Sequence, residues 1–125
     1  MKSFILLLAL SFIVSGCDVL NGHNTVTLEQ LETQLKDIRN FVSEGDCSQA
    51  GECAYLAIGS KACGGPMGYI VFSNNIDIAA LKKLVDKYTA DQKTYNIENN
   101  VISDCSLANP PEKIGCVDGS CVEIR

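Results

Sequence analysis

Apolar residues recur at helical spacing in two stretches of the chain. The first stretch carries one stripe, made of Leu28, Leu31, Leu35, Ile38 and Val42. The second carries another, made of Ile78, Leu81, Leu84, Val85 and Tyr88. This spacing predicts an amphipathic helix in each stretch. We expect both stripes to pack against their own domain, because the polar face of the first helix has mixed charges and is not basic.

Capping residues mark where both helices are expected to begin. Thr27 is followed three residues later by Gln30, which is the spacing of a capping box. Asp77 is placed to be the N-cap of the second helix. Two alternatives stay open for the end of the second helix: it continues past Tyr95, or it stops and a new helix starts at Thr89.

Strand patterns lie between and after the helices. Residues 53–58 and 69–72 are rich in apolar, β-branched and aromatic side chains, and a glycine-rich loop separates them, so they predict a hairpin. A second, tight hairpin is predicted at residues 116–121, where Asp118 and Gly119 form a strong two-residue turn signal. Together these elements predict an α+β fold, with two helices packed on a small antiparallel sheet.

The N-terminal residues have the three parts of a secretory signal peptide. Lys2 supplies a positive charge, residues 4–14 form an apolar run broken only by Ser11, and small residues follow. The run is shorter than the roughly 20 apolar residues that a membrane-spanning helix needs. We therefore predict that residues 1–16 are a cleaved signal peptide.

The end of this segment predicts a lipid anchor. Val14-Ser15-Gly16-Cys17 resembles the bacterial lipobox, in which an aliphatic residue and two small residues precede a cysteine. The resemblance implies cleavage before Cys17 and attachment of a diacylglyceryl group to its thiol. The alternative is an ordinary signal peptide that happens to precede a cysteine.

Lipidation at Cys17 defines the expected organisation and location of the mature protein. Residues 17–25 would be a lipidated tether, and residues 26–125 a single disulfide-stapled domain. The protein would lie in the cell membrane or the outer membrane, with the domain facing the periplasm or the exterior. Asp18, directly after the cysteine, resembles the inner-membrane retention signal of some diderm bacteria.

The net charge of the mature chain makes some classes of binding partner less favourable than others. The full chain has 10 basic and 15 acidic residues, and removal of residues 1–16 takes away Lys2, which leaves 9 against 15 and a net charge of −6. An acidic domain without basic clusters argues against nucleic acid and against anionic lipid headgroups as ligands. The expected partners are the membrane, through Cys17, and an envelope protein.

Six cysteines remain once the lipidated one is set aside. They are Cys47, Cys53, Cys63, Cys105, Cys116 and Cys121. An even number in an exported chain predicts three disulfides. A zinc site is the weaker interpretation, because the sequence has no C-x-x-C pair and its single histidine, His23, lies in the tether. We expect neither a metal nor another cofactor.

The pairing of these cysteines stays open among 15 possibilities. A local set joins Cys116 to Cys121 across the hairpin and Cys47 to Cys53, and leaves Cys63–Cys105 as the long-range bridge. In the rival set, Cys116 reaches Cys47 or Cys53 while Cys121 binds a neighbouring strand. The geometry of the hairpin permits the local set, which we favour slightly.

Part of the domain resembles small cysteine-rich domains of uncharacterised bacterial exported proteins. The similarity covers about residues 47–122. It is carried by Ile58-Gly-Ser-Lys-Ala-Cys-Gly-Gly-Pro66, Tyr69, Ser103-Asp-Cys105, and Cys116, Gly119 and Cys121. The resemblance implies one compact domain and no known activity.

The residues show no catalytic constellation, since nucleophilic chemistry would require His23 or a free thiol. We therefore expect a non-enzymatic, lipid-anchored module that binds an envelope component. One alternative is a protease inhibitor that presents Lys61 and Ala62 on a loop braced by Cys63, since tight inhibitors use rigid loops of this kind. The other alternative is an envelope enzyme with no recognisable site.

Overall fold

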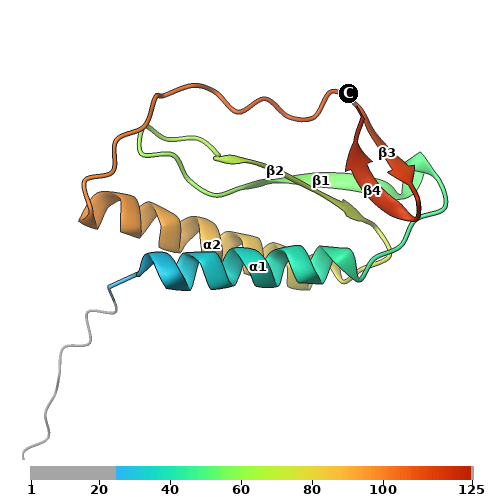
Figure 1. The fold of residues 1–125 in the computed structure, drawn as a ribbon, viewed down its shortest axis with the longest axis horizontal. Helices are drawn as coiled ribbons and strands as arrows, with labels where there is room; N and C mark the ends of the chain where they lie inside the picture. The colour runs from blue at the N-terminus through green and yellow to red at the C-terminus, as the bar shows by residue number, and fades with distance from the viewer. Residues whose placement is uncertain (1–24, 125) are drawn as a thin grey trace, which may run out of the picture.

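Two helices lie side by side along one face of a two-stranded ribbon (Figure 1). The computed structural model describes residues 25–124. Its elements are, in order, α1 (Leu28–Ser43), the short 3₁₀-helix η1 (Ala50–Glu52), β1 (Cys53–Ile58), β2 (Gly68–Ser73), α2 (Ile78–Glu98), β3 (Ile114–Val117) and β4 (Ser120–Glu123). The signal peptide, Cys17 and His23 lie outside the described residues.

The strands form two separate antiparallel ribbons. In β1–β2, Cys53 pairs with Ser73 and Ile58 with Gly68. The β3–β4 ribbon packs against β2 but is not hydrogen-bonded to it. The α+β fold with two helices and three disulfides is therefore confirmed, and the small sheet consists of two ribbons.

The core lies between the helices and the β1–β2 ribbon. Its buried side chains come from both predicted helical stripes and from both strands: Leu31, Ile38, Ile58, Phe72, Leu81, Val85 and Tyr88. Leu28 belongs to the predicted stripe of α1, yet its side chain is 55% exposed. The first side chain of α1 therefore lies outside the core, although Leu31 in the same turn is buried.

The predicted helix starts are confirmed. The backbone N–H of Thr27 donates to Gln30 Oε1 at 3.0 Å, and the N–H of Gln30 donates to Thr27 Oγ1 at 3.2 Å, which completes a capping box. Asp77 Oδ1 accepts from the N–H of Ala80 at 2.9 Å. The second helix continues unbroken to Glu98, so no new helix starts at Thr89.

The predicted tight turn between β3 and β4 is also confirmed. Asp118 and Gly119 have φ of 51° and 78°, as a two-residue hairpin turn with positive φ at both positions requires. The register places Cys116 opposite Cys121. In the described range, neither helix is both long enough and apolar enough to cross a membrane.

Candidate functional site

Three polar side chains on one face of α2 hold the loop between β1 and β2. Thr89 Oγ1 accepts from the N–H of Gly59 at 3.0 Å, and Gln92 Oε1 accepts from the N–H of Ser60 at 2.7 Å. Asn96 Nδ2 donates to the carbonyl of Ser60 at 2.7 Å. Residues three and four positions apart share one face of a helix. The face of α2 near its C-terminal end therefore positions this loop.

Lys61, in the same loop, is held on its other side by the segment after α2. Its Nζ donates to Ser106 Oγ at 2.8 Å and to the Ser106 carbonyl, and lies 3.4 Å from Asp104 Oδ1. The hydrogen bonds of the Ser106 side chain and backbone, with that of Lys61, lower the pKa of the Asp104 carboxyl below its ordinary value. The Lys61 side chain is 13% exposed.

This geometry disfavours the inhibitor alternative at Lys61 and Ala62. An inhibitor of that class offers its basic side chain to the pocket of a protease. Here the ammonium of Lys61 is bound by Ser106 and Asp104, and its side chain is largely covered. Insertion into a protease would first have to break these contacts.

One of these contacts joins a hydroxyl and an amine, the components of a nucleophile–base pair. The amine of a base must accept a proton from the hydroxyl of the nucleophile. Lys61 Nζ instead donates to Ser106, and Ser106 Oγ lies 2.9 Å from Asp104 Oδ2 and acts as a donor to that carboxylate. These contacts hold the loop to the segment after α2.

A disulfide completes the attachment of the loop. Cys63 is bonded to Cys105, with their Cα atoms 5.5 Å apart. This bridge confirms the long-range member of the local set. The loop between β1 and β2 is thus held to α2 by hydrogen bonds, and to the segment after α2 by a covalent bond and the contacts of Lys61.

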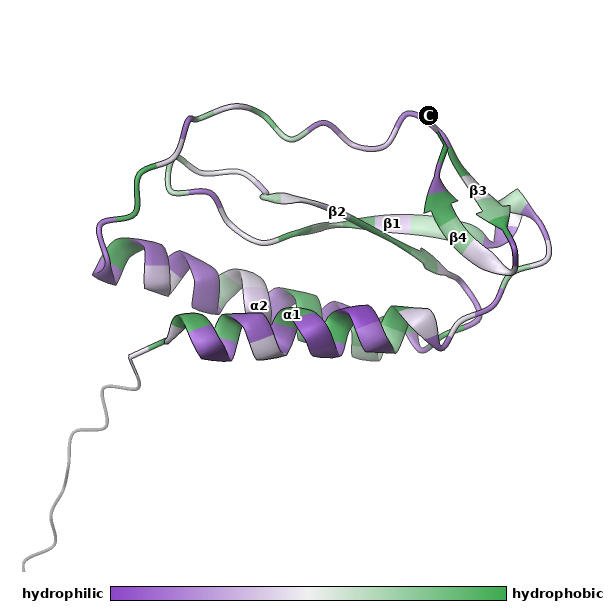
Figure 2. Cartoon of the chain, in the orientation of Figure 1, coloured by the Kyte–Doolittle hydropathy of each residue, from purple (hydrophilic) through white to green (hydrophobic). Residues whose placement is uncertain are grey.

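Exposed apolar side chains gather around this loop, where α1 begins and α2 ends. The apolar end patch consists of Leu28 (55% exposed), Met67 (52%), Ile97 (69%), Val101 (38%) and Ile102 (93%). All but Ile97 line a cavity of about 520 Å³, and Ile97 and Val101 line a neighbouring cavity of about 400 Å³. In Figure 2, the chain beyond the C-terminal end of α2 becomes strongly hydrophobic after a short hydrophilic stretch.

Sequence reasoning did not find the apolar end patch. The helical spacing of Leu28 predicts a buried side chain, and Val101 and Ile102 lie in a segment without helical or strand periodicity. The available signal was the adjacent apolar pair Val101 and Ile102, which comes shortly after the helix and outside any helical or strand pattern that would bury it.

A cluster of four cysteines lies at the other end of the molecule. Cys47 is bonded to Cys116 and Cys53 to Cys121, with Cα–Cα distances of 5.9 and 5.5 Å. The predicted local bridges Cys47–Cys53 and Cys116–Cys121 are therefore wrong. Cys116 and Cys121 oppose each other in the β3–β4 hairpin, so their side chains project from the same face. They do not bond to each other, and each forms a disulfide with one of the two cysteines that flank η1.

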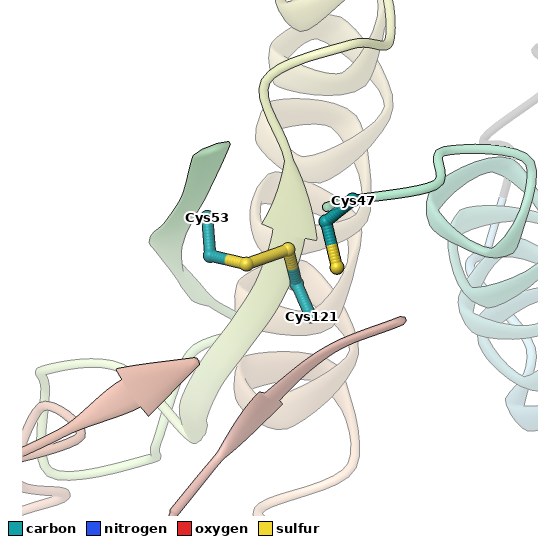
Figure 3. Close-up of side chains that lie close together, drawn as sticks. All are labelled: Cys47, Cys53 and Cys121. Atoms are coloured by element: carbon teal, nitrogen blue, oxygen red, sulfur yellow. A yellow bond between two sulfur atoms is a disulfide. The ribbon is translucent and has the colours of Figure 1, made fainter. Parts of the chain in front are cut away.

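The two bridges in this cluster lie close together. The Sγ atoms of Cys47, Cys53 and Cys121 all lie within 4.8 Å of one another (Figure 3). Thiolates at this spacing could bind a metal ion. All three sulfurs are in disulfides, however, and a disulfide sulfur is not a thiolate. The oxidised protein therefore offers two neighbouring disulfides at this position.

Replacing Cys116 is expected to produce a mixture of disulfide isomers. Cys116→Ser leaves Cys47 as a thiol within 4.8 Å of both sulfurs of the Cys53–Cys121 bridge. Its thiolate can attack one of these sulfurs, forming one S–S bond and releasing the other sulfur as a thiolate. Peptide mapping without reduction should find Cys47 bonded to Cys53 or Cys121, beside the original bridge.

The matched control for this exchange is Cys63→Ser. It frees Cys105 at the opposite end of the molecule, away from the sulfur cluster, and should leave the Cys53–Cys121 bridge as one species. If Cys116→Ser also gave a single Cys53–Cys121 bridge and a fully alkylatable Cys47, the close approach of the two bridges would be contradicted.

Comparison with known proteins adds no relative to this description. The chain matches no known protein family, no curated protein and no solved structure. The similarity to small cysteine-rich exported domains therefore stays a prediction that rests on the residues alone.

Proposed function

We propose that this chain is a lipid-anchored, non-enzymatic binding module of the bacterial cell envelope. The supporting observation is how its seven cysteines are used. The six in the described domain pair completely with one another, so Cys17 has no disulfide partner left within the chain. An odd cysteine in an exported protein is otherwise a reactive thiol or an intermolecular bridge. Lipidation at the lipobox-like sequence accounts for it.

The three disulfides support a location of the domain outside the cytoplasm. Disulfides form and persist in oxidising compartments such as the periplasm and the cell surface. The mature protein would be held in the cell membrane or the outer membrane through Cys17, with its domain facing the periplasm or the exterior. Its acidic charge favours a protein or another envelope component as partner over nucleic acid.

A capture experiment tests whether the module binds. The lipidated mature protein, held in detergent, serves as bait for an envelope extract, and the same protein after reduction and alkylation is the control. A binding module should retain a component that the reduced form does not retain. If a turnover screen with the same preparation revealed catalysis, the non-enzymatic proposal would be wrong.

A separate assay distinguishes the inhibitor alternative. Because the Lys61 ammonium is bound by Ser106 and Asp104, the mature protein should leave trypsin-like proteases active at stoichiometric concentration. Inhibition that disappeared in Lys61→Gln, while persisting in the exposed-lysine control Lys82→Gln, would instead establish the inhibitor function.

A further inference from the structure

We propose that the apolar end patch contacts the interface of the lipid bilayer and orients the domain on the membrane. This inference rests on the lipid attachment at Cys17 proposed above and extends it. The lipid would act as one contact with the membrane, and the patch as a second. The β3–β4 hairpin, at the opposite end of the helices, would then point away from the membrane (Figure 1).

The first argument is the composition of the apolar end patch. Its five side chains come from three separate parts of the chain: the start of α1, the end of the β1–β2 loop, and the region from the end of α2 to Ile102. Large apolar side chains that gather in this way on a small domain mark a surface that binds another apolar phase or molecule. The hydrogen bonds and the disulfide of the loop hold two of these parts together, and α1 packs against α2, so the patch is preformed.

The second argument is the position of the tether. Seven residues separate Cys17 from Thr25, so the Cα atoms of these two residues lie at most about 28 Å apart even in a fully extended chain. Thr25 is only three residues before Leu28 of the patch. The far end of α1 is a further 24 Å or so along the helix, at about 1.5 Å per residue. The anchor therefore keeps the patch, rather than the hairpin, next to the bilayer.

The third argument concerns charge and selects the kind of lipid surface. Lys61 and Asp104, which both line the larger cavity, form an ion pair with each other. Lys93, beside the smaller cavity, is one further positive charge at this end. A surface of this kind has no basic cluster for anionic headgroups. Contact should therefore depend on the apolar side chains and occur with zwitterionic lipid.

A modest intrinsic affinity is sufficient for this contact. Short tethers raise the effective concentration of a linked site to the millimolar range. Apolar side chains of peripheral proteins enter the boundary between headgroups and acyl chains to a depth of about 5–10 Å. The patch thus needs only shallow insertion, which the most exposed of its side chains, Ile102, is placed to make.

Tryptophan fluorescence tests the proposal directly, since the sequence contains no Trp. Ile102→Trp places a single fluorophore in the patch, at a side chain that is 93% exposed, so the substitution leaves the core unchanged. Val117→Trp, at the turn end of the β3–β4 hairpin and 48% exposed, is the matched control. Both lipidated proteins are reconstituted into phosphatidylcholine vesicles with or without bromine on the acyl chains.

Bilayer contact by the patch predicts that brominated lipid lowers the emission of Ile102→Trp about twofold or more and leaves that of Val117→Trp unchanged. The result for Ile102→Trp should be the same when anionic phosphatidylglycerol is added. Equal quenching of both variants, quenching that requires anionic lipid, or no quenching of Ile102→Trp would each overturn the proposal.

Flotation of the same vesicles separates this inference from the proposed function. If the proteins float with the vesicles but Ile102→Trp is not quenched, the lipid anchor stands and the patch proposal fails. If the proteins do not float and their N-terminal peptide carries no lipid, the anchor itself is wrong, and the patch proposal falls with it.

Discussion

Removal of both disulfides that hold the β3–β4 hairpin is expected to lower the free energy of unfolding by about 7 kcal/mol. The bridges Cys47–Cys116 and Cys53–Cys121 close loops with sequence separations of 69 and 68 residues. Domains of this size are stable by only about 5–15 kcal/mol in total. The variant with all four cysteines replaced by serine should therefore be largely unfolded, as measured by urea denaturation followed by circular dichroism.

The two bridges should not contribute additively. While one bridge is intact, the second bridge closes only a short additional loop of roughly 11 residues, made of the chain from Cys47 to Cys53 and from Cys116 to Cys121. Loss of this second bridge alone is therefore expected to lower the free energy of unfolding by about 3 kcal/mol. Removal of the remaining bridge then opens a loop of nearly 70 residues and costs about 4 kcal/mol. Each bridge is removed alone and with the other, which completes a double-mutant cycle.

The same cycle distinguishes the two sets of pairings. Local bridges Cys47–Cys53 and Cys116–Cys121 would close loops of five or six residues, each worth about 2 kcal/mol, and their losses would simply add. Additive losses of that size would contradict the pairing in the structure. If removal of the second bridge lowered the free energy of unfolding more than removal of the first, the pairing in the structure would be supported.

The second large effect is expected at the N-terminus. Cys17→Ala should abolish lipid attachment and move the protein from the membrane fraction to the soluble fraction, or leave it as an uncleaved precursor. Each methylene of an acyl chain that enters the bilayer contributes about 0.8 kcal/mol, so the loss of a diacylglyceryl group removes most of the membrane affinity. Fractionation with an alkaline wash measures the effect.

Asp18→Ser is the matched control for this experiment. It changes the residue beside the proposed lipidation site but keeps the cysteine, so the protein should stay in a membrane fraction. If it moved between the inner and the outer membrane, the resemblance of Asp18 to a retention signal would be supported. If Cys17→Ala itself stayed membrane-bound and was cleaved at the same site, the proposed lipid anchor would be wrong.

The parts of the fold that follow from local chemistry could be predicted from the sequence. The capping box of Thr27 and Gln30 involves residues three positions apart, and its geometry is a property of any helix start. The turn at Asp118 and Gly119 likewise requires positive φ at two adjacent residues, which these residue types tolerate. Such signals are complete within a few residues, and the structure confirms them.

The features that join distant segments could not be predicted in this way. Thr89 and Gln92 have the spacing of a helix cap, but the tertiary structure uses both side chains to hold the β1–β2 loop. The hairpin register of Cys116 and Cys121 is correct, yet it says nothing of the cysteines that approach from η1. The disulfide partners of Cys116 and Cys121 depend on tertiary packing, which brings together residues almost 70 positions apart in the sequence.

The candidate site depends on the same long-range packing. Leu28 has the spacing of a core residue, but its side chain, at the first position of α1, lies outside the core and is exposed. Lys61 looks accessible in a glycine-rich loop, whereas its ammonium is bound by residues more than 40 positions away. Whether such a side chain is exposed therefore depends on which segments pack against it, and the periodicity of its own segment does not determine this.

Mass spectrometry of the N-terminal peptide of the mature protein, purified from membranes, tests the central proposal most directly. A lipid-anchored envelope module should give a peptide that begins at Cys17 and carries the mass of a diacylglyceryl group on its thiol, with the other six cysteines resistant to alkylation. An N-terminus elsewhere, or an unmodified Cys17 at the start of the peptide, would contradict the proposal.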